Sequence, residues 1–333
     1  MDKTAWLAST IEEPVDALEE IVDPHHHLWD FPTGTYLLPE LHEDTGSGHN
    51  VTQTVFVECG AGYKDQGPDY LRPVGEVEFV NEQANLSAEQ DGAEIAAIVG
   101  FADLTRGEAV AEVLAAQDAA GGGRFRGIRH ANAWDLSDEI RASHTKPPPG
   151  LLGHDDFRAG FATLGQMGFS FDAWMFHPQV KELVELVAAV PDTPVVLDHI
   201  GGPLGIGPYE GARDAVRSTL RPALEALAQH EHVVVKVGGI GMSIYGAGLN
   251  RLPEAPTSEH VANVWSEDIR HCVDTFGPER CMFESNFPVD KQGCSYTVLF
   301  NAFQRIADEA GWSASERGQL FSGTARRFYR INP

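Results

Sequence analysis

Three consecutive histidines are the most chemically suggestive feature of this sequence. They lie in the segment DPHHHLW (23–29), directly after the apolar pair Ile21 and Val22. Side chains alternate along a strand, so His25 and His27 share one face and His26 lies on the other. Two imidazoles in this arrangement can bind one metal ion or hold one polar group of a substrate. We therefore predict that His25 and His27 are catalytic.

Three further basic residues stand at the ends of short apolar runs. His199 follows Val195–Leu197 and precedes Gly-Gly-Pro within two residues, His177 follows an aromatic-rich run, and Arg129 lies near the end of another run. Histidine can exchange protons, and arginine can pair with a substrate carboxylate or a developing oxyanion. We predict a catalytic role for His199 and substrate binding by Arg129 and His177. The structural alternatives are a core histidine bonded to a carbonyl group and an ion pair inside the fold.

The elements that must position these side chains alternate along the chain. Eight short apolar runs, most of them followed by a helix-like segment, predict repeated βα units and a parallel sheet. Eight strands favour a closed barrel over an open sheet, and no GxGxxG pattern follows the first run. We predict an α/β fold, a single (β/α)8 TIM barrel. The runs are Ile21–Asp23, Thr54–Glu58, Ile95–Phe101, Phe125–His130, Phe169–Phe176, Val195–His199, Val233–Val237 and Cys281–Glu284, and the helical segments are Gly75–Glu89, Gly107–Ala120, Asp155–Met167, Gln179–Val190, Gly211–Gln229, Ser258–Phe276, Tyr296–Ala310 and Ser313–Tyr329.

The carboxyl ends of the strands in such a barrel form the face that carries catalytic groups, so the predicted residues would meet there. Two irregular segments, 134–153 and 238–257, follow strands and open on the same face. The first contains Pro-Pro-Pro-Gly and is either a loop that shapes the substrate site or an inert surface loop. We predict an N-terminal extension over residues 1–20 and a single barrel domain over residues 21–333.

Six motifs, in order along the chain, resemble those of the amidohydrolase-related family, the branch of the amidohydrolase superfamily that contains lactonases acting on pyrone dicarboxylates and sugar lactones. The resemblance covers residues 21–330 and implies a barrel enzyme. It also implies substrate-binding roles for Trp29, in the first motif, and Lys236, in the fourth. The motifs are DPHHHLW (23–29), GIR (127–129), LDHIGGP (197–203), VKV (235–237), MFESNFP (282–288) and TARRFY (324–329).

The eighth-strand motif departs from the family pattern. Asn286 stands where the family has an aspartate that serves as metal ligand or general base, and an amide cannot take up a proton. Glu284 stands two residues earlier, where the family usually has glycine, so we predict that Glu284 supplies the proton-handling carboxylate. Asn286 stays among the predicted catalytic residues. Glu58, predicted to bind substrate, and Asp290 are the other candidate carboxylates, and the structural alternative for Glu284 is a buried ion pair with Arg129 or Lys236.

The resemblance implies hydrolysis of a small cyclic ester or a related acyl compound. His25, His27 and His199 would hold one divalent metal, most simply zinc, or would polarise the carbonyl group without a metal; the resemblance leaves both open. The first alternative is a metal-dependent non-oxidative decarboxylase on the same scaffold. The second is a catalytically inactive barrel that acts as a binding protein.

The composition limits the classes of molecule that this protein is expected to bind. The 333 residues carry 24 lysines and arginines against 49 acidic residues, a formal charge of −25, which disfavours nucleic acids and anionic membranes. We expect a small-molecule substrate, which can be anionic if a local cation binds it, and no organic cofactor; a homo-oligomer is compatible with the sequence. Four cysteines without CxxC spacing, no signal-peptide pattern and no long apolar stretch predict a cytoplasmic protein with free thiols.

Overall fold

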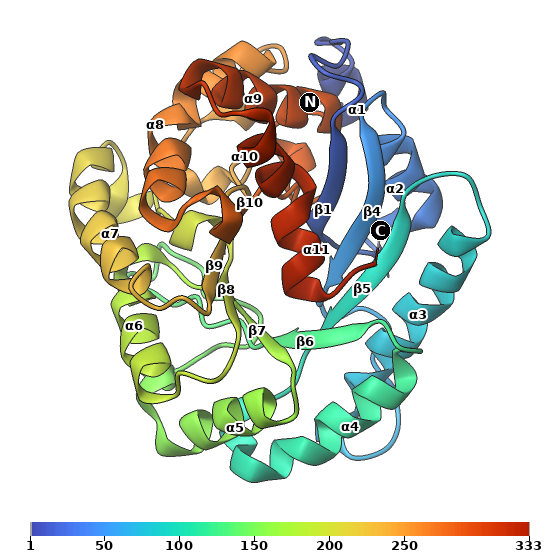
Figure 1. Ribbon diagram of the computed structural model, residues 1–333, viewed down its shortest axis with the longest axis vertical. Helices are drawn as coiled ribbons and strands as arrows, with labels where there is room; N and C mark the ends of the chain where they lie inside the picture. The colour runs from blue at the N-terminus through green and yellow to red at the C-terminus, as the bar shows by residue number, and fades with distance from the viewer. Residues whose placement is uncertain (1, 333) are drawn as a thin grey trace.

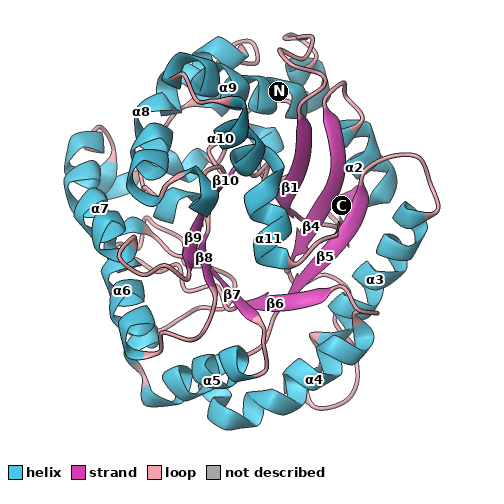
Figure 2. Cartoon of the chain, viewed as in Figure 1, coloured by secondary structure: helices cyan, strands magenta, loops and turns pink. Residues whose placement is uncertain are grey.

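Eight β-strands pair side by side, all parallel and in chain order, in the computed structural model, which describes residues 2–332. Figure 1 shows them as a ring, and Figure 2 shows helices surrounding this ring. The predicted (β/α)8 barrel is therefore confirmed, and each of the eight apolar runs overlaps one of its strands. The strands are β1 (Glu20–His26), β4 (Asn50–Val57), β5 (Glu94–Gly100), β6 (Phe125–Arg129), β7 (Ser170–Ala173), β8 (Val195–Leu197), β9 (Val233–Lys236) and β10 (Cys281–Met282).

The helices pack their apolar faces against the outside of the ring. In α6 the buried residues Val180, Leu183, Leu186 and Val187 recur at the three- and four-residue spacing of one helix face. None of the helices within residues 2–332 is long and apolar enough to cross a membrane. The larger helices, all predicted, are α3 (Val74–Ala88), α4 (Val110–Ala120), α5 (Asp155–Gln166), α6 (Val180–Ala189), α7 (Arg213–Leu227), α8 (Ser258–Phe276) and α9 (Tyr296–Ala310). The short elements α1 (Lys3–Leu7), α2 (Leu38–Thr45), β2 (Trp29–Phe31) and β3 (Gly34–Tyr36) were not predicted.

Strands β8 and β10 end earlier than predicted, because the chain turns sharply at their carboxyl ends. His199 and Ile200 after β8 have φ angles of 56° and 57°, and Asn286 after β10 has a φ angle of 55°. A non-glycine residue in this left-handed region costs free energy and persists only where the surrounding structure holds it, often at functional sites. These turns interrupt the alternation of side chains along a strand. Side chains of consecutive residues can therefore both point into the carboxyl end of the barrel.

The ring closes between β1 and the segment that follows β10. The backbone N–H of Asn286 donates to the carbonyl of His25, and the N–H of His27 donates to the carbonyl of Phe287, each at 2.8 Å. These bonds lie at the carboxyl end of the barrel, so the closure itself fixes the backbone of two predicted site residues.

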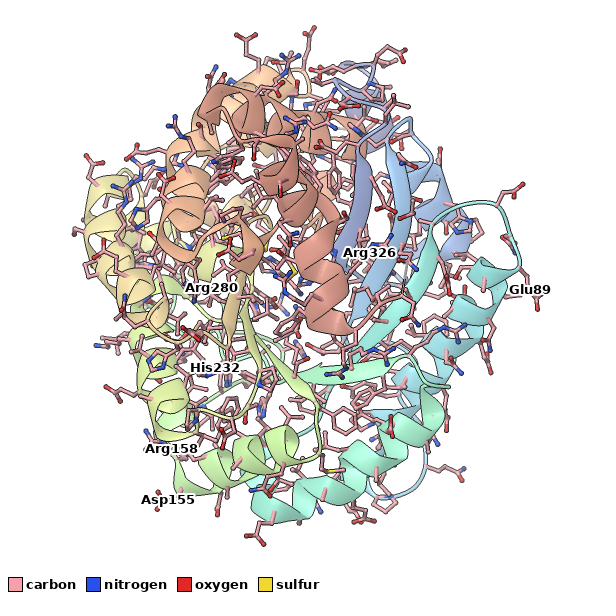
Figure 3. The ribbon with its side chains drawn as sticks, in the orientation of Figure 1. Glu89, Asp155, Arg158, His232, Arg280 and Arg326 are labelled. Carbon is pink, nitrogen blue, oxygen red and sulfur yellow. The ribbon has the colours of Figure 1, made fainter. Side chains whose placement is uncertain are left out.

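The predicted C-terminal helix is divided into α10 (Ala314–Gly318), a π-helical turn (Gln319–Gly323) and α11 (Thr324–Tyr329). The N–H of Phe283 donates to the carbonyl of Leu320 at 2.9 Å, which ties this turn to the chain after β10. Arg326 of α11 donates at 2.7 Å to Glu20, the first residue of β1, so α11 lies at the amino ends of the strands; Figure 3 shows Arg326 beside them.

Helix α11 lies across one end of the ring, in front of the strands in Figure 1. Its residues complete the apolar layer inside the barrel. The hydroxyl of Tyr329 reaches inward and donates to Oδ2 of the buried Asp172 at 2.7 Å. The layer consists of Val22, Val55, Val57, Ala97, Val99, Val196, Val234 and Met282 from the strands, with Ala325, Tyr329 and Ile331 from the C-terminal segment.

The N-terminal segment packs along the outside of the barrel. The indole of the buried Trp6 donates to the carbonyl of Leu252 at 2.9 Å, which fastens the segment to the 238–257 loop. The N–H of Val15 donates to Asn301 of α9 at 2.8 Å. The division into an extension and a barrel domain remains a prediction.

We predict that Tyr329→Phe lowers the free energy of unfolding by about 1–3 kcal/mol, because it removes a donor from a fully buried carboxylate. Urea unfolding of both proteins measures the difference. Tyr70→Phe is the matched control, because its hydroxyl bonds to Glu112 at the surface. Equal losses in the two variants would show that Asp172 does not depend on the C-terminal helix.

Candidate active site

The predicted histidines meet at the carboxyl ends of the strands. The ring centroids of His25 and His27 lie 5.0 Å apart, and those of His25 and His199 lie 4.6 Å apart. All three side chains are buried, with at most 3% of each residue exposed. Burial disfavours the charged imidazole and lowers the pKa of His27 and of His199 to about 3, so both rings are neutral at physiological pH.

Glu284 binds His199 through one carboxylate oxygen. Its Oε1 accepts the Nδ1–H of His199 at 2.7 Å and the backbone N–H of the same residue at 3.1 Å. The neutral ring then carries its proton on Nδ1, and Nε2 has a free lone pair that forms no hydrogen bond with residues 2–332. Gly238 and Gly239 make this contact possible, because a Cβ on either would lie within 2.4 Å of an atom of Glu284 or His199.

The other oxygen of Glu284 faces His25. Oε2 lies 2.7 Å from Nδ1 of His25 but is not aligned for a hydrogen bond. Burial raises the pKa of Glu284 well above its usual value. Glu284 therefore contacts two of the three histidines, and burial makes its carboxylate a stronger proton acceptor than an exposed one. The predicted alternative, a direct ion pair with Arg129 or Lys236, is not the arrangement in the structure.

Arg129 is bound to Glu58. Its Nε donates to Oε1 of Glu58 at 2.7 Å, one terminal nitrogen donates to the carbonyl of Glu58 at 2.5 Å, and the other lies 3.3 Å from Nε2 of His25. Burial alone would raise the pKa of Glu58, but Arg129 and then His144 outweigh burial and lower the pKa to about 2. The guanidinium group is thus committed to a protein carboxylate, whereas the sequence predicted that it binds substrate.

Lys236 is fully buried between two aspartates. Its Nζ donates to Oδ2 of Asp172 at 2.7 Å and lies 3.1 Å from Oδ1 of Asp198 and 3.2 Å from Nδ1 of His25. Burial opposes the charge of Lys236, but the two aspartates outweigh it and raise its pKa. Burial, and then Lys236, lower the pKa of His25 well below its usual value, so His25 is neutral as well.

Asn286 lies between His27 and Asp290. Its Oδ1 is 3.3 Å from Nε2 of His27, and its Nδ2 donates to Oδ1 of Asp290 at 2.8 Å. The Nδ1–H of His27 donates to the carbonyl of Val57 at 2.7 Å. Trp29 is half-buried and stacks on the ring of His27, with centroids 6.1 Å apart. The carbonyl of Val57 and the indole of Trp29 therefore hold His27, whose unprotonated Nε2 faces Oδ1 of Asn286 without a hydrogen bond.

His177 lies apart from this network. Its Nδ1 accepts the N–H of Leu204 at 3.4 Å, and its ring meets Tyr209 edge to face at 4.9 Å. Trp174, three residues earlier in the preceding predicted run, does contact the cluster, because its indole lies edge to face with His199 at 4.7 Å. The aromatic residue before the predicted histidine is thus the one adjacent to the cluster.

The residues of the cluster fit a divalent cation. One ligand atom each from His25, Asp198 and His199 lie within 4.8 Å of one another. Both oxygens of Asp198 and Oε2 of Glu284 are buried without a hydrogen-bond partner. Imidazole and carboxylate are a donor set that zinc accepts. The histidine pair in this group is His25 and His199, whereas the predicted set included His27 instead of Asp198.

Sequence reasoning passed over Asp198, Asp172 and His144 as site residues. Asp198 precedes His199, so simple alternation would place the two on opposite faces; the left-handed turn at His199 brings both inward. Asp172 lies within β7, and no sequence motif marks it as a site residue; it is only a carboxylate within an apolar run. His144 lies in an irregular loop, and its Nε2 is 3.2 Å from Oε2 of Glu58.

Comparison with known proteins identifies relatives over nearly the whole chain. A family model described as amidohydrolase matches residues 22–331. An L-fucono-1,5-lactonase of Burkholderia multivorans is 29% identical over 325 residues, covering 93% of this chain and 96% of the lactonase. The protein y4mH of Sinorhizobium fredii is 31% identical over 332 residues, covering 93% of this chain and 98% of y4mH.

Solved structures agree with these relatives. An amidohydrolase of Burkholderia multivorans with bound zinc superposes with a TM-score of 0.70 at 27% identity, covering 94% of this chain and 99% of that one. A protein of Pseudomonas putida described as a 2-pyrone-4,6-dicarboxylic acid hydrolase shares the fold, with a TM-score of 0.63 at 18% identity and coverage of 94% and 98%.

We predict that Arg129→Ala lowers the free energy of unfolding by about 3–5 kcal/mol, because Glu58 would stay buried without its cation. Urea unfolding measures the loss, and the exposed Arg270→Ala is the control. The double variant Glu58→Gln/Arg129→Ala should recover part of the loss, since residue 58 then carries no charge that lacks its cation. A stable Arg129→Ala protein with only a raised KM would instead return Arg129 to the substrate-binding role.

Proposed function

The chain belongs to the amidohydrolase family, and on this premise we propose that it hydrolyses a small, uncharged cyclic ester, a lactone, to the ring-opened acid. The observation that carries the proposal is the Glu284–His199 pair, which leaves Nε2 of a neutral imidazole free at the carboxyl end of the barrel. A lactone is also the substrate class in the name of the Burkholderia multivorans relative.

Hydrolysis of a lactone needs a base that activates water. In the proposed mechanism Nε2 of His199 takes a proton from water while the Nδ1 proton passes to Oε1 of Glu284. Burial raises the pKa of Glu284, so the carboxyl group can hold that proton. The hydroxide oxygen bonds to the lactone carbonyl carbon, the ring C–O bond breaks, and the stored proton returns to the leaving alkoxide.

The indoles beside the histidines would bind the ring of the substrate. Trp29 stacks on His27, and Trp174 meets His199 edge to face. Both indoles are half-buried and present apolar surface next to the proposed base. This arrangement can orient the C–H face of a ring and exclude bulk water from the reacting carbonyl group.

A divalent cation, where present, would be held by His25, His199 and Asp198 and would lower the pKa of a bound water. The buried charges favour such a cation. Six buried carboxyl groups contact one of the histidines, Arg129, Lys236 or Asn286. Among the buried residues that the structure describes, only Arg129 and Lys236 carry a permanent positive charge. The six, each 0% exposed, are Asp23, Glu58, Asp172, Asp198, Glu284 and Asp290.

The decarboxylase alternative receives less support from the geometry. A substrate carboxylate needs an available cation, but Arg129 is bound to Glu58 and Lys236 to Asp172. The surplus of buried carboxyl groups also repels an anion. These observations favour a neutral substrate over the anionic one that the sequence left open. The reaction product distinguishes the two functions, because decarboxylation releases carbon dioxide and lactone hydrolysis releases a ring-opened acid.

The experiment is acid release from a panel of five- and six-membered lactones, before and after chelation of divalent metals and after zinc is restored. We expect hydrolysis of at least one lactone and no carbon dioxide from aromatic carboxylates. Carbon dioxide release without lactone hydrolysis would overturn the proposal in favour of the decarboxylase.

Glu284→Gln should lower kcat on the best lactone by about 100-fold or more, the usual contribution of a general base, because the amide cannot accept the relayed proton. KM should change little, since this carboxyl group lies behind the imidazole. Glu89→Gln is the control; Figure 3 shows Glu89 at the outer edge of the molecule. Full activity of Glu284→Gln would move the base to another carboxylate or to a metal-bound hydroxide.

A further inference from the structure

His144 lies in the long loop between β6 and α5, and the structure fixes its position. The N–H of Ser143 donates to the carbonyl of Ala133 at 2.9 Å, and the hydroxyl of Ser143 donates to the carbonyl of Ala131 at 3.2 Å. The hydroxyl of Thr145 donates to the same carbonyl. Ser143 and Thr145, the two neighbours of His144, are thus both bound to Ala131, which lies two residues after Arg129. The loop folds back over the end of β6.

The imidazole of His144 covers Glu58. Its Nε2 lies 3.2 Å from Oε2 of Glu58, and its side chain is 47% exposed whereas that of Glu58 is fully buried. Because Arg129 binds Oε1 of Glu58 and lies 3.3 Å from His25, a continuous line of polar groups leads from solvent to the catalytic cluster. His144 is the outermost member of that line.

One oxygen of Glu58 in this line lacks a hydrogen bond. Oε2 is buried, and its contact with His144 is not aligned as a hydrogen bond, so the oxygen has no hydrogen-bond partner among residues 2–332. A buried carboxylate oxygen without a donor is costly, and a ligand that supplies a donor gains that free energy. The half-exposed ring of His144 can rotate towards solvent and admit such a ligand.

The groups between Glu58 and His144 favour a neutral hydroxyl group as the ligand. An anion would be repelled by Glu58, and the charge of Glu58 is already balanced by Arg129, so a cation gains little. A hydroxyl can donate to Oε2 of Glu58 and accept from the N–H of His144 at the same time. We propose that His144 and Glu58 form the subsite that recognises a ring hydroxyl of the substrate, which makes His144 a specificity-determining residue. This inference rests on the proposed function.

The test compares glucono-1,5-lactone with δ-valerolactone, which has the same ring without hydroxyls. His144→Ala should lower kcat/KM for the hydroxylated lactone about tenfold, mainly through KM, the effect of losing one hydrogen bond, and should leave δ-valerolactone within twofold. His144→Gln, which keeps a donor, should stay within about threefold of the parent enzyme. His154→Ala is the control, because His154 is exposed in the same region. Equal losses on both lactones, or none, would overturn the subsite.

A binding measurement separates this inference from the proposed function. If the parent enzyme hydrolyses neither lactone, the proposed function fails, and titration calorimetry with 1,5-anhydroglucitol, a non-hydrolysable ring with hydroxyls, decides about the subsite. Binding that His144→Ala weakens about tenfold, with tetrahydropyran binding unaffected, supports the subsite. No binding of 1,5-anhydroglucitol, or equal binding by both proteins, overturns it.

Discussion

The interior of the barrel encloses more carboxyl groups than cations at its catalytic end, and the arrangement of the site follows from this imbalance. Arg129 and Lys236 each neutralise a carboxylate at 2.7 Å, Glu58 and Asp172 respectively. Glu284 and Asp198 keep oxygens without a hydrogen-bond partner beside His25, although Asp198 also lies 3.1 Å from Lys236. Such a site must hold an extra proton or a cation, because uncompensated buried charge is strongly unfavourable. With Glu284 ionised, the Glu284–His199 pair can take a proton from water and hold it on the carboxyl group, and a divalent cation would supply an activated water. Both serve hydrolysis.

The fold supports this concentration of charge from two sides. The hydroxyl of Tyr329 in α11 stabilises Asp172 from the closed end of the barrel. At the open end, left-handed backbone at His199 and Asn286 turns side chains inward that a regular strand would direct outward. The free energy cost of these turns is offset by the hydrogen bonds that they allow, of which the two from His199 to Glu284 are the clearest example.

The architecture could be predicted because its signal is repeated eight times: each apolar run is short, and each is followed by turn residues or an amphipathic segment. The convergence of the histidines followed from their places at strand ends. The partners of the charged residues could not be predicted, because Glu58 and Arg129 are 71 residues apart and only the barrel brings them together. Asp198 could not be predicted from strand alternation, because the left-handed turn at His199 breaks that alternation.

The central claim is that Glu284 fixes His199 as the Nδ1–H tautomer with a bare Nε2. Long-range ¹H–¹⁵N correlation spectra of ¹⁵N-histidine-labelled protein at neutral pH measure this directly, with His199→Gln to assign the signals. The account predicts a protonated Nδ1 and an unprotonated Nε2 for His199 in the parent protein, and a change in tautomer or exchange behaviour in Glu284→Gln. An Nε2–H tautomer, or an imidazolium ring, in the parent protein would contradict it.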